Sequence, residues 1–314
     1  MVRTDGPPDP WAPPAPTASP APPGAAAPPH DATAWAEPIT QPLPAILAAP
    51  ADTTPGRRPD GPTHGRGDGR WSLVDVLAGF GLVLVLSAAL SWPFGVFEGI
   101  PREVSLLVAG FLPIWLGLTG AAWWASRRHG TGNLRRDLGL VIKPVDLAIG
   151  LGVGLGMRVV SVILTLAISA LQGGVGRGNL ESVTSGIGDV ALVLNLVVGA
   201  TLIAPVVEEL FFRGLLIRSS MSSLQRRLTP AQLTDPARQA RCRWITVGLS
   251  SVLFVVLHLP ELTDPYSVLP LGTSLLLMGG VCALLTMHTG RLGSAIVAHM
   301  TFNGVAAVVT LTQL

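Results

Sequence analysis

Long apolar runs alternate with short polar loops from residue 72 to the end of the chain. Seven runs reach or approach the length of about 20 apolar residues with which a helix crosses a bilayer. They cover residues 72–92, 104–125, 145–171, 190–217, 244–259, 268–287 and 292–311. The pattern predicts an all-α fold, a polytopic transmembrane bundle of about seven helices. Pro93 and Pro260 are expected to end the first and fifth helices.

Residues 1–70 have a different composition. Eighteen of the 28 prolines lie there, mixed with Ala, Gly, Thr and Asp. Such a segment cannot bury enough apolar area to offset its conformational entropy, so it is predicted to be a disordered, partly polyproline tail. It does not resemble a signal peptide, because no apolar core follows a basic start. We therefore separate a tail at 1–70 from two N-terminal helices with a basic loop at 71–145 and a helical domain at 146–314.

The charged residues make up only 13% of the chain, about half the share of a soluble domain. The basic ones gather in the loops at 127–143 and 218–243 and in the turn that holds Arg291, whereas the other loops are poor in them. The positive-inside rule then predicts a cell-membrane protein with a cytoplasmic N-terminus and an extracytoplasmic C-terminus. Residues 133–140 either lie along the membrane surface as a short amphipathic piece or form an ordinary basic loop.

The fourth run carries three charges, Glu208, Glu209 and Arg213, within six residues. Each costs about 2.5–3.5 kcal/mol near the bilayer centre, so partners are expected. Arg213 follows Glu209 by four residues and can pair with it on one helix face. Glu208 points about 100° away and is left as the candidate working carboxylate. The alternative is a buried salt-bridge cluster that only orients helices. Pro205 is expected to kink this run.

Three more polar residues lie at membrane depth: His258 in the fifth run, and His299 and Asn303 on one face of the seventh. At about 1.5 Å per residue, they and Glu208 lie about 10–20 Å into their helices and can meet at one level. A carboxylate and an imidazole can deprotonate a water, and a second imidazole with a carboxamide can donate to an oxyanion. Glu208, His258 and His299 are alternatively Zn²⁺ ligands, so the expected cofactor is none or Zn²⁺. The usual His-Glu-x-x-His zinc-protease signature is absent.

Two polar residues elsewhere in the apolar runs require partners. Arg158 lies midway along the third run, where a lone charge is costly. We expect it to pair with Glu209, with binding of a substrate carboxylate as the alternative. Asn195 is expected to form an interhelical hydrogen bond. Cys242 and Cys282 have neither disulfide nor metal-ligand spacing and are predicted to be structural.

The polar motifs resemble those of a known family when they are taken in order along the chain. Glu208-Glu209-x-x-x-Arg213, Phe254-x-x-x-His258 and His299-x-x-x-Asn303 are similar to the three motifs of the CAAX-type prenyl endopeptidases. These belong to the CPBP (ABI) intramembrane proteases, which include bacterial members linked to bacteriocin self-immunity. The resemblance covers residues 146–308 and implies that 146–314 is a catalytic transmembrane domain.

The resemblance also implies a role for each residue of the motifs. Glu208 and His258 would activate the water, and His299 with Asn303 would bind the oxyanion. Glu209, Arg213 and Phe254 would support them. The family has been described both as metalloproteases and as glutamate-dependent, metal-free enzymes, and both mechanisms stay open at this point.

The sequence thus favours an intramembrane endopeptidase whose partners are a lipid bilayer and a peptide or membrane-protein substrate, with no nucleic acid. It does not predict the oligomeric state. A non-enzymatic scaffold or bacteriocin-immunity protein that uses the same polar cluster to bind a partner is the alternative. A proton-coupled transporter is a weaker one, because no internal repeat is evident. The Arg-rich and Pro-rich composition suggests a GC-rich bacterium as the source.

Overall fold

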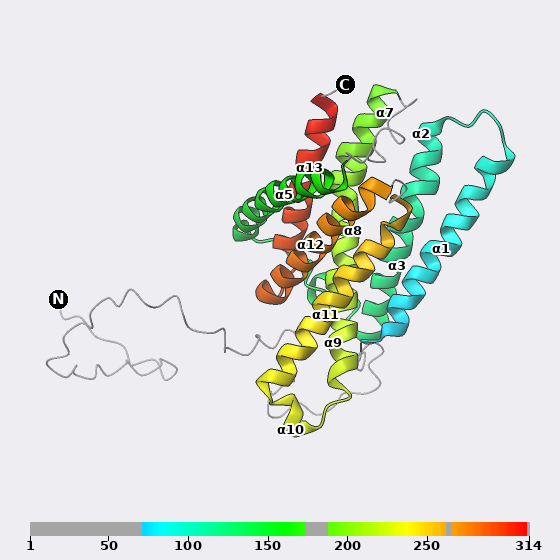
Figure 1. Cartoon of the computed structure of the whole chain (residues 1–314). Helices are drawn as coiled ribbons and strands as arrows, with labels where there is room; N and C mark the ends of the chain where they lie inside the picture. The colour runs from blue at the N-terminus through cyan, green and yellow to red at the C-terminus, as the bar shows by residue number, and fades with distance from the viewer. Residues whose placement is uncertain (1–70, 174–187, 262–264, 313–314) are drawn as a thin grey trace, which may run out of the picture. The chain divides into compact units, whose positions relative to one another are not determined.

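The computed structural model of the chain describes residues 71–173, 188–261 and 265–312 (Figure 1). Within these ranges every regular element is a helix, so the predicted all-α fold is confirmed. The predicted disordered tail, residues 1–70, lies outside the described residues.

Seven of the helical spans are long and apolar enough to cross a membrane, which confirms a multi-pass membrane protein. They are Leu73–Val96, Glu103–His129, Pro144–Gln172, Val190–Gln225, Pro236–Leu257, Tyr266–Thr289 and Gly293–Thr312. The helices are α1 (Leu73–Val96), α2 (Arg102–Ser105), η2 (Leu106–Phe111), α3 (Leu112–His129), α4 (Leu134–Asp137), α5 (Pro144–Gln172), α7 (Asp189–Val193), η3 (Leu194–Ile203), α8 (Ala204–Glu209), η4 (Leu210–Leu216), α9 (Ile217–Gln225), α10 (Pro230–Leu233), α11 (Pro236–Leu257), η5 (Leu259–Glu261), α12 (Pro265–Thr289) and α13 (Gly293–Thr312).

Two predicted helix ends need correction. Pro93 lies inside α1, which continues to Val96. The fifth span begins at Pro236 rather than near residue 244, because Asp235 caps α11 by accepting a hydrogen bond from the backbone N–H of Ala237. An aspartate at the cap with proline in the first turn is a common helix start, but the polar residues that follow it concealed the signal. α11 ends at Leu257, and Pro260 lies in the 3₁₀ turn η5.

The fourth span is one long helix that changes its hydrogen-bonding register along its length. η3 and η4 are π-helical, with i→i+5 bonds, and the short α-helical segment α8 lies between them. The backbone N–H of Ala204 still donates to the carbonyl of Gly199, five residues back. Pro205 follows in the first turn of α8 and has no N–H to donate. Where we expected a kink at Pro205, the structure has this change of register.

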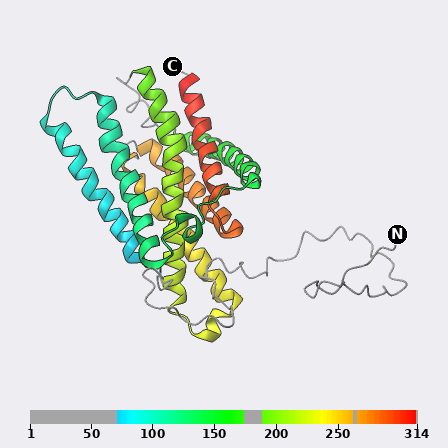
Figure 2. The same cartoon turned by 180° about the vertical axis from the view of Figure 1, so that it is seen from behind.

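The long helix α7–α9 passes between α3 and α13 (Figure 2). α13 packs most extensively against α5 and also contacts α12, η3 and α8. On the other side, Phe211 and Phe212 meet Phe80 and Phe254 edge to face, with ring centroids 5.3–6.1 Å apart. Apolar packing of this kind fixes the long helix against α1 and α11.

Glycines allow α5 to approach α13 closely. A Cβ atom at Gly154 would lie 2.5 Å from the carbonyl oxygen of Ala298 and 2.6 Å from the Cβ of Thr301. Gly150, one turn earlier, also lies against α13. Small residues four apart are a usual means of bringing transmembrane helices together. This contact sets the position of α13.

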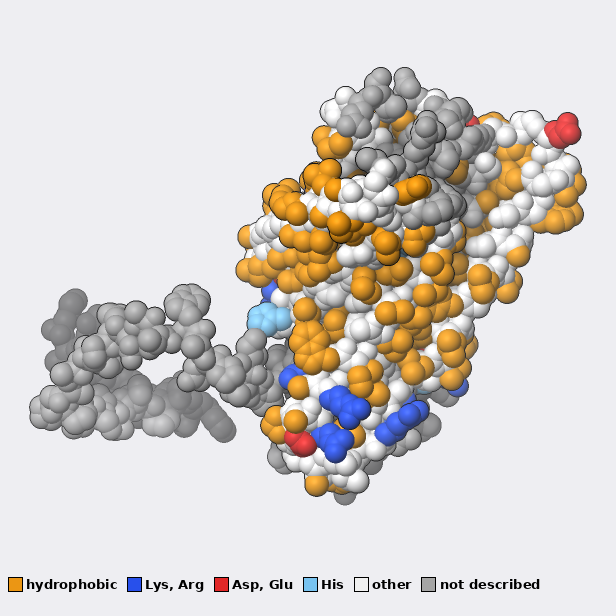
Figure 3. Space-filling view, viewed as in Figure 1, with side chains coloured by type: hydrophobic (Ala, Val, Ile, Leu, Met, Phe, Trp, Pro, Cys, Tyr) orange, Lys and Arg blue, Asp and Glu red, His pale blue; other side chains and the backbone are white. Residues whose placement is uncertain are grey.

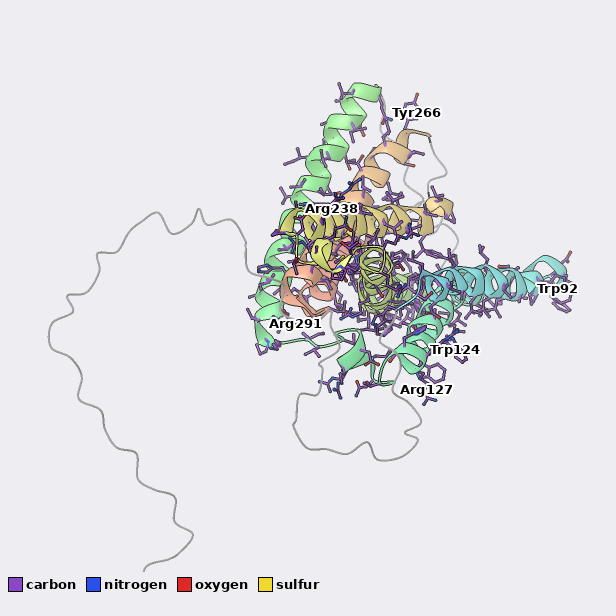
Figure 4. The ribbon with its side chains drawn as sticks, turned by 90° about the horizontal axis from the view of Figure 1, so that it is seen from below. Trp92, Trp124, Arg127, Arg238, Tyr266 and Arg291 are labelled. Carbon is purple, nitrogen blue, oxygen red and sulfur yellow. The ribbon has the colours of Figure 1, made fainter. Side chains whose placement is uncertain are left out.

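One end of the helical domain carries the basic loops and is held by polar contacts. Asp146 at the start of α5 accepts hydrogen bonds from Arg291 Nε at 2.8 Å and from Ser294, which join α5 to the start of α13. The hydrogen bond to Asp146 raises the pKa of the Arg291 guanidinium. Lys and Arg side chains gather at this end in Figure 3, and Figure 4 views it from below, with Arg127 and Arg238.

Replacing Gly154 with alanine is expected to destabilise the protein, because the new methyl group overlaps α13 and overpacking costs about 1–3 kcal/mol. The melting temperature in detergent should fall by about 2–4 °C for each kcal/mol lost. Gly152→Ala is the matched control on the same helix, since its Cβ would meet nothing within 4 Å. Equal melting temperatures for both variants would contradict the close α5–α13 contact.

Candidate active site

Glu208 and Glu209 are the last two residues of α8 and lie inside the fourth span. Glu209 is fully buried, whereas Glu208 keeps 7% of its surface exposed. Arg213, one turn later on η4, is also fully buried, and its Nη1 lies 3.0 Å from Glu209 Oε1. The structure thus brings together the two residues that we expected to pair.

Two other helices hold the Arg213 guanidinium in place. Its Nη2 donates to the backbone carbonyl of Gly279 on α12 at 3.1 Å. Its central carbon lies 4.6 Å from the ring centroid of Phe254 on α11, a cation–π distance. Arg213 therefore fixes the position of Glu209 relative to α11 and α12.

His299 on α13 binds the same carboxylate. Its Nδ1 lies 2.9 Å from Glu209 Oε1, and only 3% of the residue is exposed. A carboxylate paired with a guanidinium only accepts hydrogen bonds, so Nδ1 carries a proton and donates it. The other ring nitrogen, Nε2, then faces Glu208, with Oε2 at 3.8 Å. Glu209 therefore orients His299, and His299 presents Nε2 toward Glu208.

His258 follows the last residue of α11 and is partly buried. Its Nδ1 lies 2.8 Å from the backbone carbonyl of Phe254, which can only accept. Nδ1 therefore carries the proton, and in the neutral ring Nε2 keeps a free lone pair. Phe254 lies between the motifs, because its ring centroid is 4.6 Å from that of His258 and 5.6 Å from that of His299.

Asn303 lies one turn after His299 on α13, as expected. Its Nδ2 donates to the backbone carbonyl of Ala200 in η3 at 2.9 Å. One amide N–H is thus occupied by the protein backbone. His299 and Asn303 both contact the long helix, the first at Glu209 and the second nine residues earlier.

The expected pairing of Arg158 with Glu209 is wrong. Arg158 Nε donates to the backbone carbonyl of Phe302 at 3.1 Å, and its guanidinium lies 3.9 Å from the Phe302 ring centroid. α5 packs directly against α13, so Arg158 meets the backbone of α13 there, while Glu209 is already bound by two nearer partners. Asn195 also differs from expectation, since its Nδ2 donates to Ala191 of the same helix at 2.8 Å.

Two members of the site were not identified in the sequence. They are the backbone carbonyls of Gly279, which binds Arg213, and of Ala200, which binds Asn303. Every residue has a carbonyl, so only the tertiary structure can mark these two. The nearest signal was Pro205, five residues after Ala200, which removes one backbone donor.

The fit of a metal ion can be judged from the arrangement of possible ligands. No three or more His, Cys, Asp or Glu side chains come together as a metal-binding group within residues 71–173, 188–261 and 265–312. Nδ1 of His299 is engaged by Glu209, which leaves Nε2 as the only ring nitrogen that could bind a metal. In this arrangement Glu208, His258 and His299 do not come together as a three-ligand group, so the mechanism is written without a metal.

Removing one partner of the buried Glu209–Arg213 pair should strand a charge at a cost of about 3–5 kcal/mol. Glu209→Gln and Arg213→Met alone should each lower the melting temperature in detergent strongly, and the double variant should recover part of the loss. Arg238→Gln is the control, because its contact with Asp235 is exposed and 4.0 Å long, and such pairs contribute about 0–1 kcal/mol. Single variants as stable as this control would show that the pair does not stabilise the fold.

The comparisons with known proteins agree with the three motifs. Residues 190–305, which run from α7 into α13 and contain all three, match the family model described as type II CAAX prenyl endopeptidase Rce1-like. No curated protein and no solved structure gives a significant match to the chain. Over residues 190–305 the chain is therefore similar to the Rce1-like type II CAAX prenyl endopeptidases.

Proposed function

We propose that this chain is an intramembrane endopeptidase that hydrolyses a peptide bond with a water activated by Glu208 and His258. The observation that carries the proposal is the unequal use of two adjacent buried carboxylates. Glu209 is occupied by Arg213 and His299. Glu208 makes no hydrogen bond to another described residue and keeps some exposure next to an imidazole. A purely structural ion cluster would use both.

The reaction follows from the tautomers of the two histidines. Glu208, helped by the free lone pair on His258 Nε2, removes a proton from the water as its oxygen attacks the peptide carbonyl carbon. The carbonyl electrons move to oxygen, and a hydrogen bond from His299 Nε2 stabilises that oxyanion, which requires a proton on this nitrogen as well as on Nδ1. Glu209 holds the opposite side of the His299 ring. As the C–N bond breaks, the proton taken up by Glu208 passes to the leaving amine.

The proposed catalytic domain extends beyond the matched segment. α5 lies outside residues 190–305 but packs closely on α13 and so supports the helix that carries His299. This contact favours a domain boundary near residue 146, with 146–314 as the catalytic part. The substrate is proposed to be a peptide or membrane protein, and the name of the family suggests a prenylated C-terminal sequence as the first probe.

Glu208→Gln keeps the shape of the side chain but removes the proton acceptor, so kcat should fall by at least about 10²-fold. The probe is a fluorogenic S-farnesyl peptide with a CAAX sequence, and mass spectrometry of membranes, looking for new peptide termini, provides a readout without a chosen substrate. Glu98→Gln is the control, because Glu98 is an exposed residue after α1.

Three outcomes would contradict this mechanism. Near-normal turnover by Glu208→Gln would remove Glu208 as the base. Identical peptide termini with wild type and Glu208→Gln would favour the scaffold or immunity function. One equivalent of zinc in the purified wild type that is lost in His299→Ala, with activity restored by added Zn²⁺, would favour the metalloprotease mechanism over the metal-free one.

We also propose that the end with the basic loops faces the cytoplasm, with the N-terminus on that side and the C-terminus across the cell membrane. The start of α1 and the end of α3 meet at this end, where Asp75 and His129 lie 2.9 Å apart. Arg226 donates to the backbone carbonyl of Trp71 there at 3.1 Å. The positive-inside rule supports this orientation.

A cysteine introduced at Arg238 should react with a membrane-impermeant maleimide only after cells are permeabilised, whereas one at Glu98 should react in intact cells. Both positions are exposed. The native Cys242 and Cys282 are buried, so the wild type should give little background and serves as the control. The reverse labelling pattern would invert the proposed orientation.

A further inference from the structure

The backbone of the long helix contains an acceptor that loses its regular donor. In the π-helical register of η3 the N–H of residue i+5 bonds the carbonyl of residue i. Ala204 follows this rule and donates to Gly199. The next donor, for the carbonyl of Ala200, would be residue 205, which is proline and has no N–H. An unpaired carbonyl is unfavourable where no water can reach it, as at the core of a bilayer.

Asn303 supplies the missing donor. Its Nδ2 lies 2.9 Å from the Ala200 oxygen, across the contact between α13 and η3. The side-chain amide therefore replaces the backbone N–H that Pro205 lacks. Thr201, the next residue, also bonds at five-residue spacing, because its Oγ1 donates to the Leu196 carbonyl at 2.8 Å.

The Asn303–Ala200 hydrogen bond can influence the orientation of the two glutamates because of its position along the long helix. Ala200 precedes Glu208 by eight residues, and the change from π to α register lies between them. Each residue of an α-helix turns by about 100°, so a shift of the register by one residue would turn Glu208 and Glu209 away from His299. Asn303 and His299 share one face of α13, which therefore holds the long helix on both sides of the register change.

We propose that Asn303 is a positioning residue that compensates for Pro205 by binding the Ala200 carbonyl, and so sets the direction of Glu208 and Glu209. The effect on catalysis rests on the proposed function, whereas the contact itself does not. This role differs from donation to the oxyanion, for which the second N–H of the same amide would be used.

A double-mutant cycle between Asn303→Ala and Pro205→Ala separates the two roles. An alanine at 205 restores a backbone N–H that can bond Ala200. Asn303→Ala alone should lower kcat for the farnesyl peptide by about tenfold or more, with KM little changed, whereas in the Pro205→Ala background the same change should cost less than about threefold. An oxyanion donor would cost about 10²–10³-fold in both backgrounds. Losses equal within twofold in the two backgrounds would overturn the proposal.

Hydrogen–deuterium exchange provides a second readout that depends on neither turnover nor the folding of Pro205→Ala. In Asn303→Ala the backbone amides of residues 201–209 should exchange about tenfold faster or more, because the turn before the glutamates loses its hydrogen bond to α13. Those of α5 should not change. Asn195→Ala is the matched control, since it removes an amide that donates to Ala191 of the same helix. Unchanged exchange at 201–209 would overturn the proposal.

The two proposals can fail separately. A wild type that neither cleaves the farnesyl peptide nor creates new peptide termini would remove the proposed function. The exchange experiment would still decide whether Asn303 fixes the long helix. Faster exchange in Asn303→Ala together with an unchanged kcat would leave the contact in place and overturn its role in positioning the glutamates.

Discussion

One buried oxygen, Oε1 of Glu209, pairs with the Arg213 guanidinium at 3.0 Å and with His299 Nδ1 at 2.9 Å, and the rest of the site depends on it. Three charged or chargeable groups at membrane depth are tolerated only because they neutralise one another and Arg213 also bonds a carbonyl of α12. The same arrangement orients His299 and leaves Glu208 with little else to bind. The contacts that hold the bundle together are thus also those that leave the second carboxylate, Glu208, with few partners.

The change of helical register along the long helix also determines where the two glutamates point. A π-helical segment on either side of α8 brings Glu208 and Glu209 to face α13 while Phe211 and Phe212 pack toward α1 and α11. π-helical turns are uncommon and often lie at functional sites. Here the irregular backbone is supported from outside, by a side chain of α13 and by the glycines that let α5 hold α13 in place.

The sequence predicted the seven spans and the pairing of Glu209 with Arg213. Long apolar runs indicate spanning helices, and a spacing of four residues places two side chains on one helix face. The sequence could not predict that His299 binds Glu209 rather than standing free, or that Arg158 binds the backbone of α13. These contacts depend on which helices are neighbours, and a pattern within one helix does not contain that information. The carbonyl of Gly279 has no signal in the sequence, and that of Ala200 has only an indirect one, the proline five residues later.

The polar contacts between Asp146 and the start of α13 have a mechanical consequence. Arg291, Ser294 and the backbone N–H of Leu292, which donates to Gly139, hold this end of α13, so a tilt of the helix would pivot there. At about 1.5 Å per residue, His299 lies about 9 Å from Gly293 and Asn303 about 15 Å. A tilt about this end would therefore displace Asn303 more than His299, and would strain the Asn303–Ala200 bond more than the His299–Glu209 contact.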